Sequence, residues 1–416
     1  MNPGNGEKRG GEKGGGEKGY RAGTDRTVAP IETLAKVVPL ASTMGITRIA
    51  NVTGLDRIGV PVVMVCRPNS RSIAVAQGKG PDLDAAKASG LMEAAELWHA
   101  ERIDQPLRLG HLEDLRGRCA VADVGSLPRP ANSPFHARQP ILWIEGRDLY
   151  SDAACWVPYE MVHTNYTVPA PQGHGCFAAS SNGLASGNCL LEAISHALCE
   201  VIERDATTIW WQQGQAALAR TGLRLDTVDD PVCLQVIEKI AAAGLRIGVW
   251  ETTSDIGVAA FFCAIVDQRQ RFGHPGLGAG CHPGKSVALL RALTEAVQDR
   301  MTLVTGARDD LREQDYRPRA FDERVRAVES MLDATGLARD FGMVPSFAAD
   351  RFDADLDGLL GRLAAVGIEQ AIAVDLGRPE IGIAVVRVIV PGLEGPHDDA
   401  GYVPGARARA VRREPR

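Results

Sequence analysis

Short apolar runs alternate along the chain with longer segments in which apolar residues recur every three or four positions. The runs predict buried strands, most plainly at the valine-rich residues 59–67, and the periodic segments predict helices. Three long helices are expected, at residues 82–103, 189–211 and 285–304, with Asp82 or Asp84 capping the first and a glycine-rich loop before the third. Further strands are expected at IGVWETTS, VAAFFCAIVD, AIAVDL and IGIAVVRVIVPGL. Their irregular spacing indicates a mixed α/β fold.

The two ends of the chain differ in composition from the middle. Residues 1–19 are rich in glycine and repeat the triplet Gly-Glu-Lys, so we expect a tail that buries nothing. Residues 396–416 are expected to form a basic tail, either solvated or used to dock an acidic partner. Residues 20–395 are then expected to form a single domain, in which the polar residues 306–320 read as a connection.

Composition narrows the classes of function. The 416 residues are 45% hydrophobic and 24% charged, with a net charge of −6, which is typical of a globular protein and gives no sign of nucleic-acid binding. The nine cysteines form no CxxC pair, which favours a reducing compartment over a disulfide framework. The N-terminus has no apolar signal segment, and no apolar run is long enough to span a bilayer. We expect a cytoplasmic protein that does not bind membranes.

Each of the three predicted helices carries acidic or amide side chains at helical spacing. At about 100° per residue, Glu93 and Glu96 lie about 60° apart, as do Glu200 and Glu203. A single such pair is ordinary on a solvated helix, but three helices with the same feature are far less common. The residues concerned are Ser89, Glu93 and Glu96 in the first helix, Asn188, Glu192, Glu200, Glu203 and Arg204 in the second, and Glu295 and Gln298 in the third.

Like charges at this spacing repel, so converging helices would need cations between them. Mg²⁺ prefers oxygen ligands and usually binds a few carboxylates together with substrate phosphates. The pattern therefore favours a Mg²⁺–nucleotide site over three separate solvated faces. Glu192 and Glu203 lie about 16 Å apart along an unbroken helix, so either several ions are bound or the helix is broken.

A second nucleotide-binding hypothesis rests on residues 279–286, AGCHPGKS, which loosely match a phosphate-binding loop. Three features disfavour it: Ala279 replaces the first glycine, Pro283 removes a backbone donor, and the predicted strand ends at Val266, well before the loop. Lys285 is better explained as the start of the third helix. Among the scattered histidines, only His196 falls near the acidic face of the second helix.

Four ordered motifs, ASGLMEAAE, SNGLASGN with ALCEVIERDA, RALTEAVQDR and VIVPGLE, resemble those of the YcaO family of ATP-dependent enzymes that modify peptide backbones. The resemblance implies the YcaO α/β fold, in which three helices converge on ATP and its Mg²⁺, with no covalent enzyme nucleophile. It also implies roles for the motif residues. These are nucleotide binding for Arg26, Thr33, Ser89, Asn188, Arg204, Glu295 and Gln298, and metal binding for Glu93, Glu96, Glu192, Glu200 and Glu203.

The segment GITRIANVTGLDRIGVPV is similar to the opening of stand-alone YcaO members that work with a TfuA partner and form thioamides. This similarity implies a peptide or protein substrate, a TfuA-like partner, and sulfide or another sulfur donor. A homodimer is expected. Two alternatives stay open: azoline-forming cyclodehydration of a precursor peptide, and a non-catalytic nucleotide-binding scaffold of a biosynthetic complex.

Overall fold

Strands from distant parts of the chain pair into three sheets. The computed structural model describes residues 16–267, 274–334, 336–398 and 401–413. The first sheet has the order β1-β2-β3, the second β11-β10-β9-β8-β12, and the third β4-β5-β13-β14-β7 with β6 paired to β5. Among the strands of the described residues, all pairings are antiparallel except that of β8 with β12, so these strands form no doubly wound parallel sheet.

The strands are short, as their apolar runs predict. Their bounds are β1 Arg48–Asn51, β2 Val62–Cys66, β3 Val75–Lys79, β4 Leu107–Gly110, β5 Ile141–Asp148, β6 Ala154–Pro158, β7 Leu184–Gly187, β8 Gly222–Leu223, β9 Leu245–Glu251, β10 Ala260–Asp267, β11 Gly276–Cys281, β12 Leu337–Arg339, β13 Ile372–Asp375 and β14 Ala384–Ile389.

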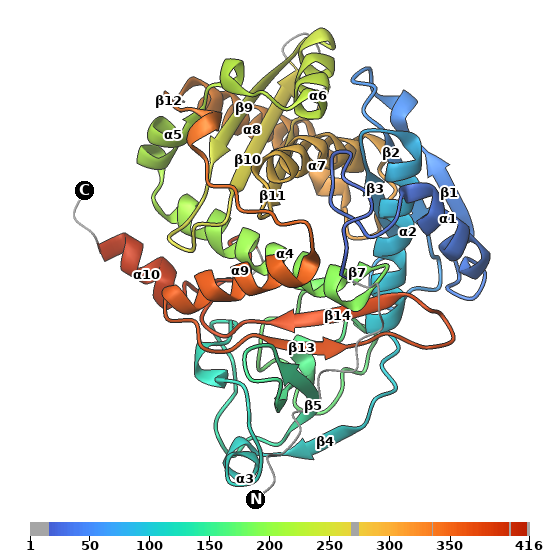
Figure 1. Ribbon diagram of the computed structural model, residues 1–416, viewed down its shortest axis with the longest axis vertical. Helices are drawn as coiled ribbons and strands as arrows, with labels where there is room; N and C mark the ends of the chain where they lie inside the picture. Colours follow the sequence, from blue (N-terminus) through green and yellow to red (C-terminus); the bar gives the residue numbers. More distant parts are fainter. Residues whose placement is uncertain (1–15, 268–273, 335, 399–400, 414–416) are drawn as a thin grey trace, which may run out of the picture.

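Three long helices join the sheets. Helix α4 runs across the middle of the molecule between the β9–β11 sheet and the β13–β14 sheet (Figure 1). Helix α2 packs on β2 and β3, and α7 packs on β11. The helix bounds are α1 Pro30–Val37, α2 Leu83–Ala100, α3 Leu112–Arg116, α4 Leu190–Gln212, α5 Gln215–Thr221, α6 Pro231–Ala242, α7 Lys285–Thr305, α8 Pro318–Asp333, α9 Phe352–Ala365 and α10 Ala406–Arg413.

Glycines in two strands let helices approach the sheets closely. A Cβ atom on Gly278 of β11 would lie 2.3 Å from the Ala292 carbonyl oxygen of α7. One on Gly78 of β3 would lie 1.9 Å from the Ala86 carbonyl oxygen of α2. Both distances are far inside van der Waals contact, so only glycine allows this packing. The close packing holds α2 against β3 and α7 against β11.

The three long helices and the mixed α/β fold were predicted correctly, and Asp82 caps α2 by accepting from the Ala85 N–H at 2.8 Å. Two predictions were wrong. The expected glycine-rich loop before α7 contains strand β11, whose glycines are used for packing. The stretch expected to be connective, 306–320, includes the start of α8 at Pro318.

Parts of both predicted tails pack against the folded domain, which their composition does not suggest. Lys18, within the predicted tail 1–19, is only 7% exposed; the remainder of that prediction, residues 1–15, lies outside the described residues. In the predicted basic tail 396–416, α10 packs on α4, and Arg407 forms an ion pair with Asp205 at 2.9 Å. Both ends are held by buried ion pairs that a composition count does not show.

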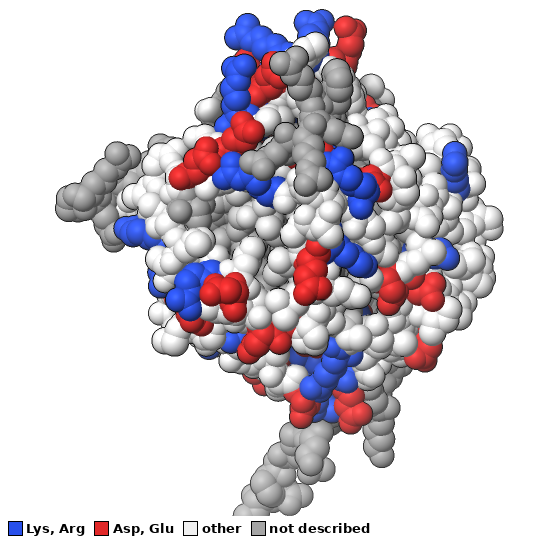
Figure 2. Space-filling view, turned by 90° about the horizontal axis from the view of Figure 1, so that it is seen from above, with Lys and Arg blue, Asp and Glu red and all other residues white. Residues whose placement is uncertain are grey.

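The surface carries no expanse of one charge on the face seen from above, where acidic and basic side chains intermix (Figure 2). This fits the small net charge of −6. Of the helices in the described part of the chain, none is both long and apolar enough to cross a lipid bilayer.

Candidate functional site

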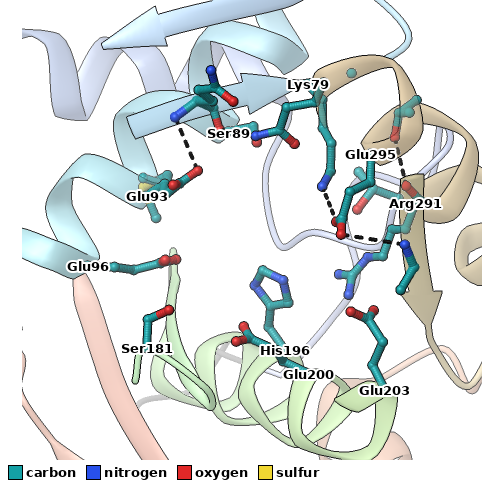
Figure 3. Close-up of a pocket in the computed structure, with 18 of the residues that line it drawn as sticks. Lys79, Ser89, Glu93, Glu96, Ser181, His196, Glu200, Glu203, Arg291 and Glu295 are labelled. Carbon is teal, nitrogen blue, oxygen red and sulfur yellow. Dashed lines mark hydrogen bonds and ion pairs between the residues drawn. The ribbon is translucent and has the colours of Figure 1, made fainter. Parts of the chain in front are cut away.

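A cavity of about 720 Å³ lies where α2, α4 and α7 come together. The carboxylates of Glu93 and Glu96 enter it from α2, those of Glu200 and Glu203 from α4, and that of Glu295 from α7 (Figure 3). The volume is in the usual range for a small-molecule site. All twelve candidate residues from the sequence line it: Arg26, Thr33, Ser89, Glu93, Glu96, Asn188, Glu192, Glu200, Glu203, Arg204, Glu295 and Gln298.

Helix α2 supplies two carboxyl groups that stay protonated to a higher pH than usual. Burial raises the pKa of Glu93 to about 7, although Lys79 opposes the shift. Burial raises the pKa of Glu96 to about 8, and the neighbouring Glu93 and Glu200 carboxylates raise it further. Glu96 is held in place by the Ser186 N–H at 2.8 Å and the Ser186 hydroxyl at 2.7 Å.

Helix α4 is continuous, so the alternative of a broken helix is excluded. Glu200 accepts a hydrogen bond from the Gly183 N–H at 3.3 Å, and burial raises its pKa. Burial also raises the pKa of Glu203 to about 7. Burial alone would lower the pKa of Arg204, but Glu203 and its neighbouring carboxylates raise it above the ordinary value. Arg204 therefore stays charged beside the acidic groups.

Helix α7 contributes one carboxylate and one amide. Burial alone would raise the pKa of Glu295, but Lys79 and Arg204 outweigh it, and the pKa lies below its ordinary value. Lys79 Nζ donates to Glu295 at 2.5 Å. The Gln298 amide donates to the Gln77 carbonyl oxygen at 3.0 Å, while its buried Oε1 has no hydrogen-bond partner in the described part of the chain.

A segment before α1 closes the cavity beside Glu192. The Thr27 N–H and hydroxyl donate to the Glu192 carboxylate at 2.9 and 2.8 Å, and Arg26 lies 3.6 Å from it. Thr33 donates to the Asn188 side chain at 3.1 Å. Asn188 precedes α4, whose N-cap is Cys189, so it lies beside the helix end and not on a helix face. Thr27 thus occupies one oxygen of Glu192, Oε2, while Oε1 has the longer contacts of Arg26 and the Asn188 amide, at 3.6 and 3.4 Å.

Residues 16–28, which we name the N-terminal strap, are anchored by a buried lysine. Lys18 Nζ lies 2.6 Å from Asp25 and 2.5 Å from Asp355 of α9. Paired backbone hydrogen bonds of 2.9 Å between Tyr20 and Arg26 fold the strap back on itself. The ammonium of Lys18 therefore fixes the strap at the point from which Arg26 reaches the cavity.

Several cavity residues were missed from the sequence. Lys79 and Gln77 face the cavity because alternate residues of β3 point away from α2, and Arg291 enters from α7. Arg308 also lines the cavity, from the stretch expected to be only connective. Arg291 opens the quoted motif RALTEAVQDR but was given no role, and the two-residue alternation of a strand could have selected Gln77 and Lys79 together.

Of two further residues noted from the sequence motifs, His196 and Arg300, only His196 lines the cavity. His196, noted from the sequence, lines the cavity, and burial lowers its pKa well below the ordinary value, so its imidazole is neutral. Arg300, the last residue of the motif RALTEAVQDR, pairs with Asp56 at 2.5 Å and is not among the cavity-lining residues.

The phosphate-loop hypothesis finds no support in the position of Lys285. Its Nζ donates to the Phe341 carbonyl oxygen at 3.0 Å and lies 4.6 Å from the centre of the Phe341 ring. Lys285 is not among the cavity-lining residues. Strand β11 does lead into this loop, contrary to one of the reasons given against the hypothesis, but the lysine points elsewhere.

The donor set fits divalent cations and phosphates. Four carboxylates with raised pKa values, Glu93, Glu96, Glu200 and Glu203, face one space with too few cations to match them. Burying such groups without partners is unfavourable, and hard cations with oxygen ligands remove the penalty. Arg26, Arg204 and Arg291 place positive charge in the wall of the same cavity.

A family model described as YcaO cyclodehydratase, ATP- and Mg²⁺-binding, matches residues 77–394. The chain therefore belongs to the YcaO family of ATP-dependent peptide-modifying enzymes. One similar protein is an uncharacterized protein in the tfuA 3′ region of Rhizobium leguminosarum bv. trifolii, which is 35% identical over 377 residues, covering 89% of each chain. Another is an uncharacterized protein of Methanothermobacter thermautotrophicus, which is 34% identical over 383 residues, covering 89% of this chain and 95% of the relative.

Solved structures share the fold. YcaO from Methanopyrus kandleri bound with AMPPCP and Mg²⁺ superposes with a TM-score of 0.71 at 22% identity, covering 94% of this chain and 99% of the other. A heterocyclase in complex with substrate and cofactor gives a TM-score of 0.70 at 23% identity, covering 89% of this chain. The match spans only 53% of that heterocyclase. The expected YcaO fold is thereby confirmed.

Proposed function

We propose that this protein uses ATP and Mg²⁺ to activate a backbone amide of a peptide or protein and replaces the amide oxygen with sulfur, forming a thioamide. The convergence of carboxylates from α2, α4 and α7 on one cavity carries the nucleotide part of the proposal. The 35% identity to a protein in a tfuA 3′ region supports the thioamide part.

Glu93, Glu96, Glu200 and Glu203 would hold Mg²⁺, because they are the carboxylates left without enough protein cations. When bound, Mg²⁺ neutralises charge on the phosphates. Glu192 would complete the metal site from its position beside Thr27. Arg26, Thr33, Ser89, Asn188, Arg204, Glu295 and Gln298 would contact the nucleotide. Glu192 and Glu203 lie about 16 Å apart along α4, which is too far for one ion to bind both, so we expect more than one ion.

The proposed reaction overcomes the poor reactivity of an amide. Sulfide adds to the carbonyl carbon and gives a tetrahedral oxyanion, whose oxygen attacks the γ-phosphorus of ATP and releases ADP. The carbon–oxygen bond then breaks with phosphate as the leaving group, and loss of the sulfur proton completes the carbon–sulfur double bond. The protein's part is to position these groups and to neutralise charge, as in other phosphoryl transfers.

Azoline formation is the second candidate function. It is favoured by the family model, which is described as a cyclodehydratase, and by the fold shared with a heterocyclase. In that reaction a neighbouring Cys, Ser or Thr side chain of the substrate replaces sulfide as the nucleophile. A scaffold that binds nucleotide without turnover is the remaining alternative, and it would not require the full set of carboxylates.

Mass spectrometry separates the three functions. The protein is incubated with Mg²⁺–ATP, sulfide, a TfuA-like protein and peptides encoded beside its gene. Thioamidation adds the mass difference between sulfur and oxygen, whereas azoline formation removes one water. Glu203→Gln should abolish either product. An unchanged peptide mass with every combination of partners would leave the scaffold as the correct function. Sedimentation of the same sample tests the predicted homodimer.

A further inference from the structure

A second cavity, of about 360 Å³, adjoins the first. Pro396 lines both cavities, and the segment 180–184 forms a wall between them. Ser180 and Asn182 face the second cavity, whereas Ser181 faces the first. The Gly183 N–H of the same segment donates to Glu200. A peptide residue bound in the second cavity would therefore be only a few residues along its chain from a residue in the first cavity.

The second cavity contains a buried arginine that is poorly paired. Arg387 of β14 is 1% exposed, and its Nη2 donates to the Ser180 carbonyl oxygen at 2.7 Å. Its Nε and Nη1 atoms have no hydrogen-bond partner in the described ranges, nor does Oδ1 of the nearby Asn182. Burial lowers the pKa of Arg387 to about 10, so the guanidinium still carries its charge at neutral pH.

Arg67 shows how a buried arginine is normally accommodated in this protein. It is 2% exposed, and it donates to the Glu101 carboxylate at 2.6 and 3.3 Å and to the Met44 carbonyl oxygen at 3.2 Å. Arg387 has a comparable burial, but Tyr166 and the Glu200 carboxylate favour its charge only through space, and no carboxylate in the described ranges forms an ion pair with it. A buried charge with unsatisfied donors destabilises a fold, and such groups are commonly found where a ligand completes the set.

Apart from Arg129 and from Glu394, whose carboxylate accepts hydrogen bonds from Tyr402 and two backbone N–H groups, the rest of the second cavity is mainly apolar. Around Arg387 its walls are formed by the side chains of Leu127, Met161, Phe177, Val201, Ile389 and Leu393. A suitable ligand therefore combines an oxygen acceptor, to take hydrogen bonds from the guanidinium, with an apolar group. A peptide backbone carbonyl, or a terminal carboxylate, next to an aliphatic side chain has this chemistry, and the cavity volume is enough for one or two residues.

We propose that the second cavity binds a segment of the acceptor peptide, with Arg387 donating to a carbonyl or carboxylate oxygen and an aliphatic side chain packing against the apolar walls. This inference rests on the proposed function, since it assumes a peptide substrate. It extends that function by placing the peptide on the far side of the 180–184 wall, so that the neighbouring amide lies beside the carboxylates.

Binding is tested without ATP or sulfur, so that the result is independent of the proposed reaction. The probes are N-acetyl-leucylglycine and its carboxamide, which distinguish a carboxylate from a backbone carbonyl. They are titrated into the full-length protein while the ¹⁵N resonance of the Arg387 Nε–H group is followed by NMR. We expect a saturable shift with at least one probe, and binding weakened about tenfold to a hundredfold in Arg387→Met. No shift with either probe overturns the proposal.

A stability comparison shows whether Arg387 is instead a structural residue. Arg387→Met removes an unpaired charge, so its melting temperature should equal or exceed that of the wild type. Arg67→Met, the matched control, leaves Glu101 unpaired and should lower the melting temperature. If Arg387→Met lowers it as much as Arg67→Met does, Arg387 stabilises the fold and the ligand-binding role is wrong, whatever the activity of the enzyme.

Discussion

Lys79 at the end of β3 donates to Glu295 of α7 at 2.5 Å, and this pair separates Glu295 from the other acidic residues of the cavity. Lys79 keeps the pKa of Glu295 below its ordinary value despite burial. At Glu93, Glu96 and Glu203 burial outweighs the nearby cations and raises the pKa values to about 7, 8 and 7, although Lys79 opposes the shift of Glu93 and Arg204, 3.8 Å from Glu203, opposes that of Glu203. The charge deficit that a metal would fill is therefore confined to the side of the cavity formed by α2 and α4.

Mg²⁺ should stabilise the protein more at alkaline pH. For a carboxylate whose folded pKa is raised, the stability gained from its protonation is complete below the unfolded pKa and is lost as pH rises through the folded pKa. For Glu93, Glu96 and Glu203 this loss occurs between about pH 4.5 and 8. Mg²⁺ replaces the lost protons, so the rise in melting temperature on adding it should be larger at about pH 8.5 than at about pH 6. A rise that is equal at both pH values would contradict this assignment.

Glu200→Gln should stabilise the metal-free protein and inactivate it. The substitution removes a charge whose burial outweighs the attraction of Arg204 and Arg387 and raises the pKa of Glu200, and it would also remove a metal ligand. We expect a higher melting temperature without Mg²⁺ and a loss of at least about a hundredfold in ATP turnover, from several kcal/mol of lost charge stabilisation. Glu145→Gln, on the exposed side of β5, is the control and should change neither quantity.

Lys18→Met should release the N-terminal strap. The variant leaves Asp25 and Asp355 as uncompensated charges, and removing one partner of a buried ion pair typically costs about 3–5 kcal/mol. Because Arg26 would no longer be held at the cavity, KM for ATP should rise more than kcat falls, and trypsin should cleave after Arg26 faster. The exposed Lys36→Met is the control. Unchanged tryptic cleavage in Lys18→Met would show that the strap is held by other contacts.

Lys285→Ala distinguishes the carboxylate site from a phosphate-binding loop. Lys285 contacts Phe341 and does not line the cavity, so the variant should lose about 1 kcal/mol of stability and keep its KM for ATP. Glu203→Gln should lose ATP turnover. The opposite pattern, with Lys285→Ala inactive and Glu203→Gln active, would favour the phosphate-loop hypothesis.

The sequence predicted the parts of this protein that depend on repeated local patterns. Periodic apolar residues located α2, α4 and α7, and helical spacing grouped Glu93 with Glu96 and Glu200 with Glu203. Arg26 and Thr33, which lie outside these helices, were reached only through resemblance to the family.

Residues whose position depends on distant partners were not predictable in this way. Lys18 lies in a glycine-rich repeat that looks solvated, and it is buried only because Asp25 and Asp355 meet there. Strand β11 was taken for a loop because its glycines, which elsewhere mark turns, here allow α7 to pack closely. Single residues such as Lys79 and Arg308 carry no periodic signal.

The most direct test of the account is a crystal structure with Mn²⁺ and a non-hydrolysable ATP analogue, in which anomalous scattering locates each metal ion. We expect peaks in the cavity within bonding distance of carboxylate oxygens from both α2 and α4 and of the phosphates of the analogue. Peaks confined to other parts of the molecule, or a nucleotide bound at Lys285, would contradict it.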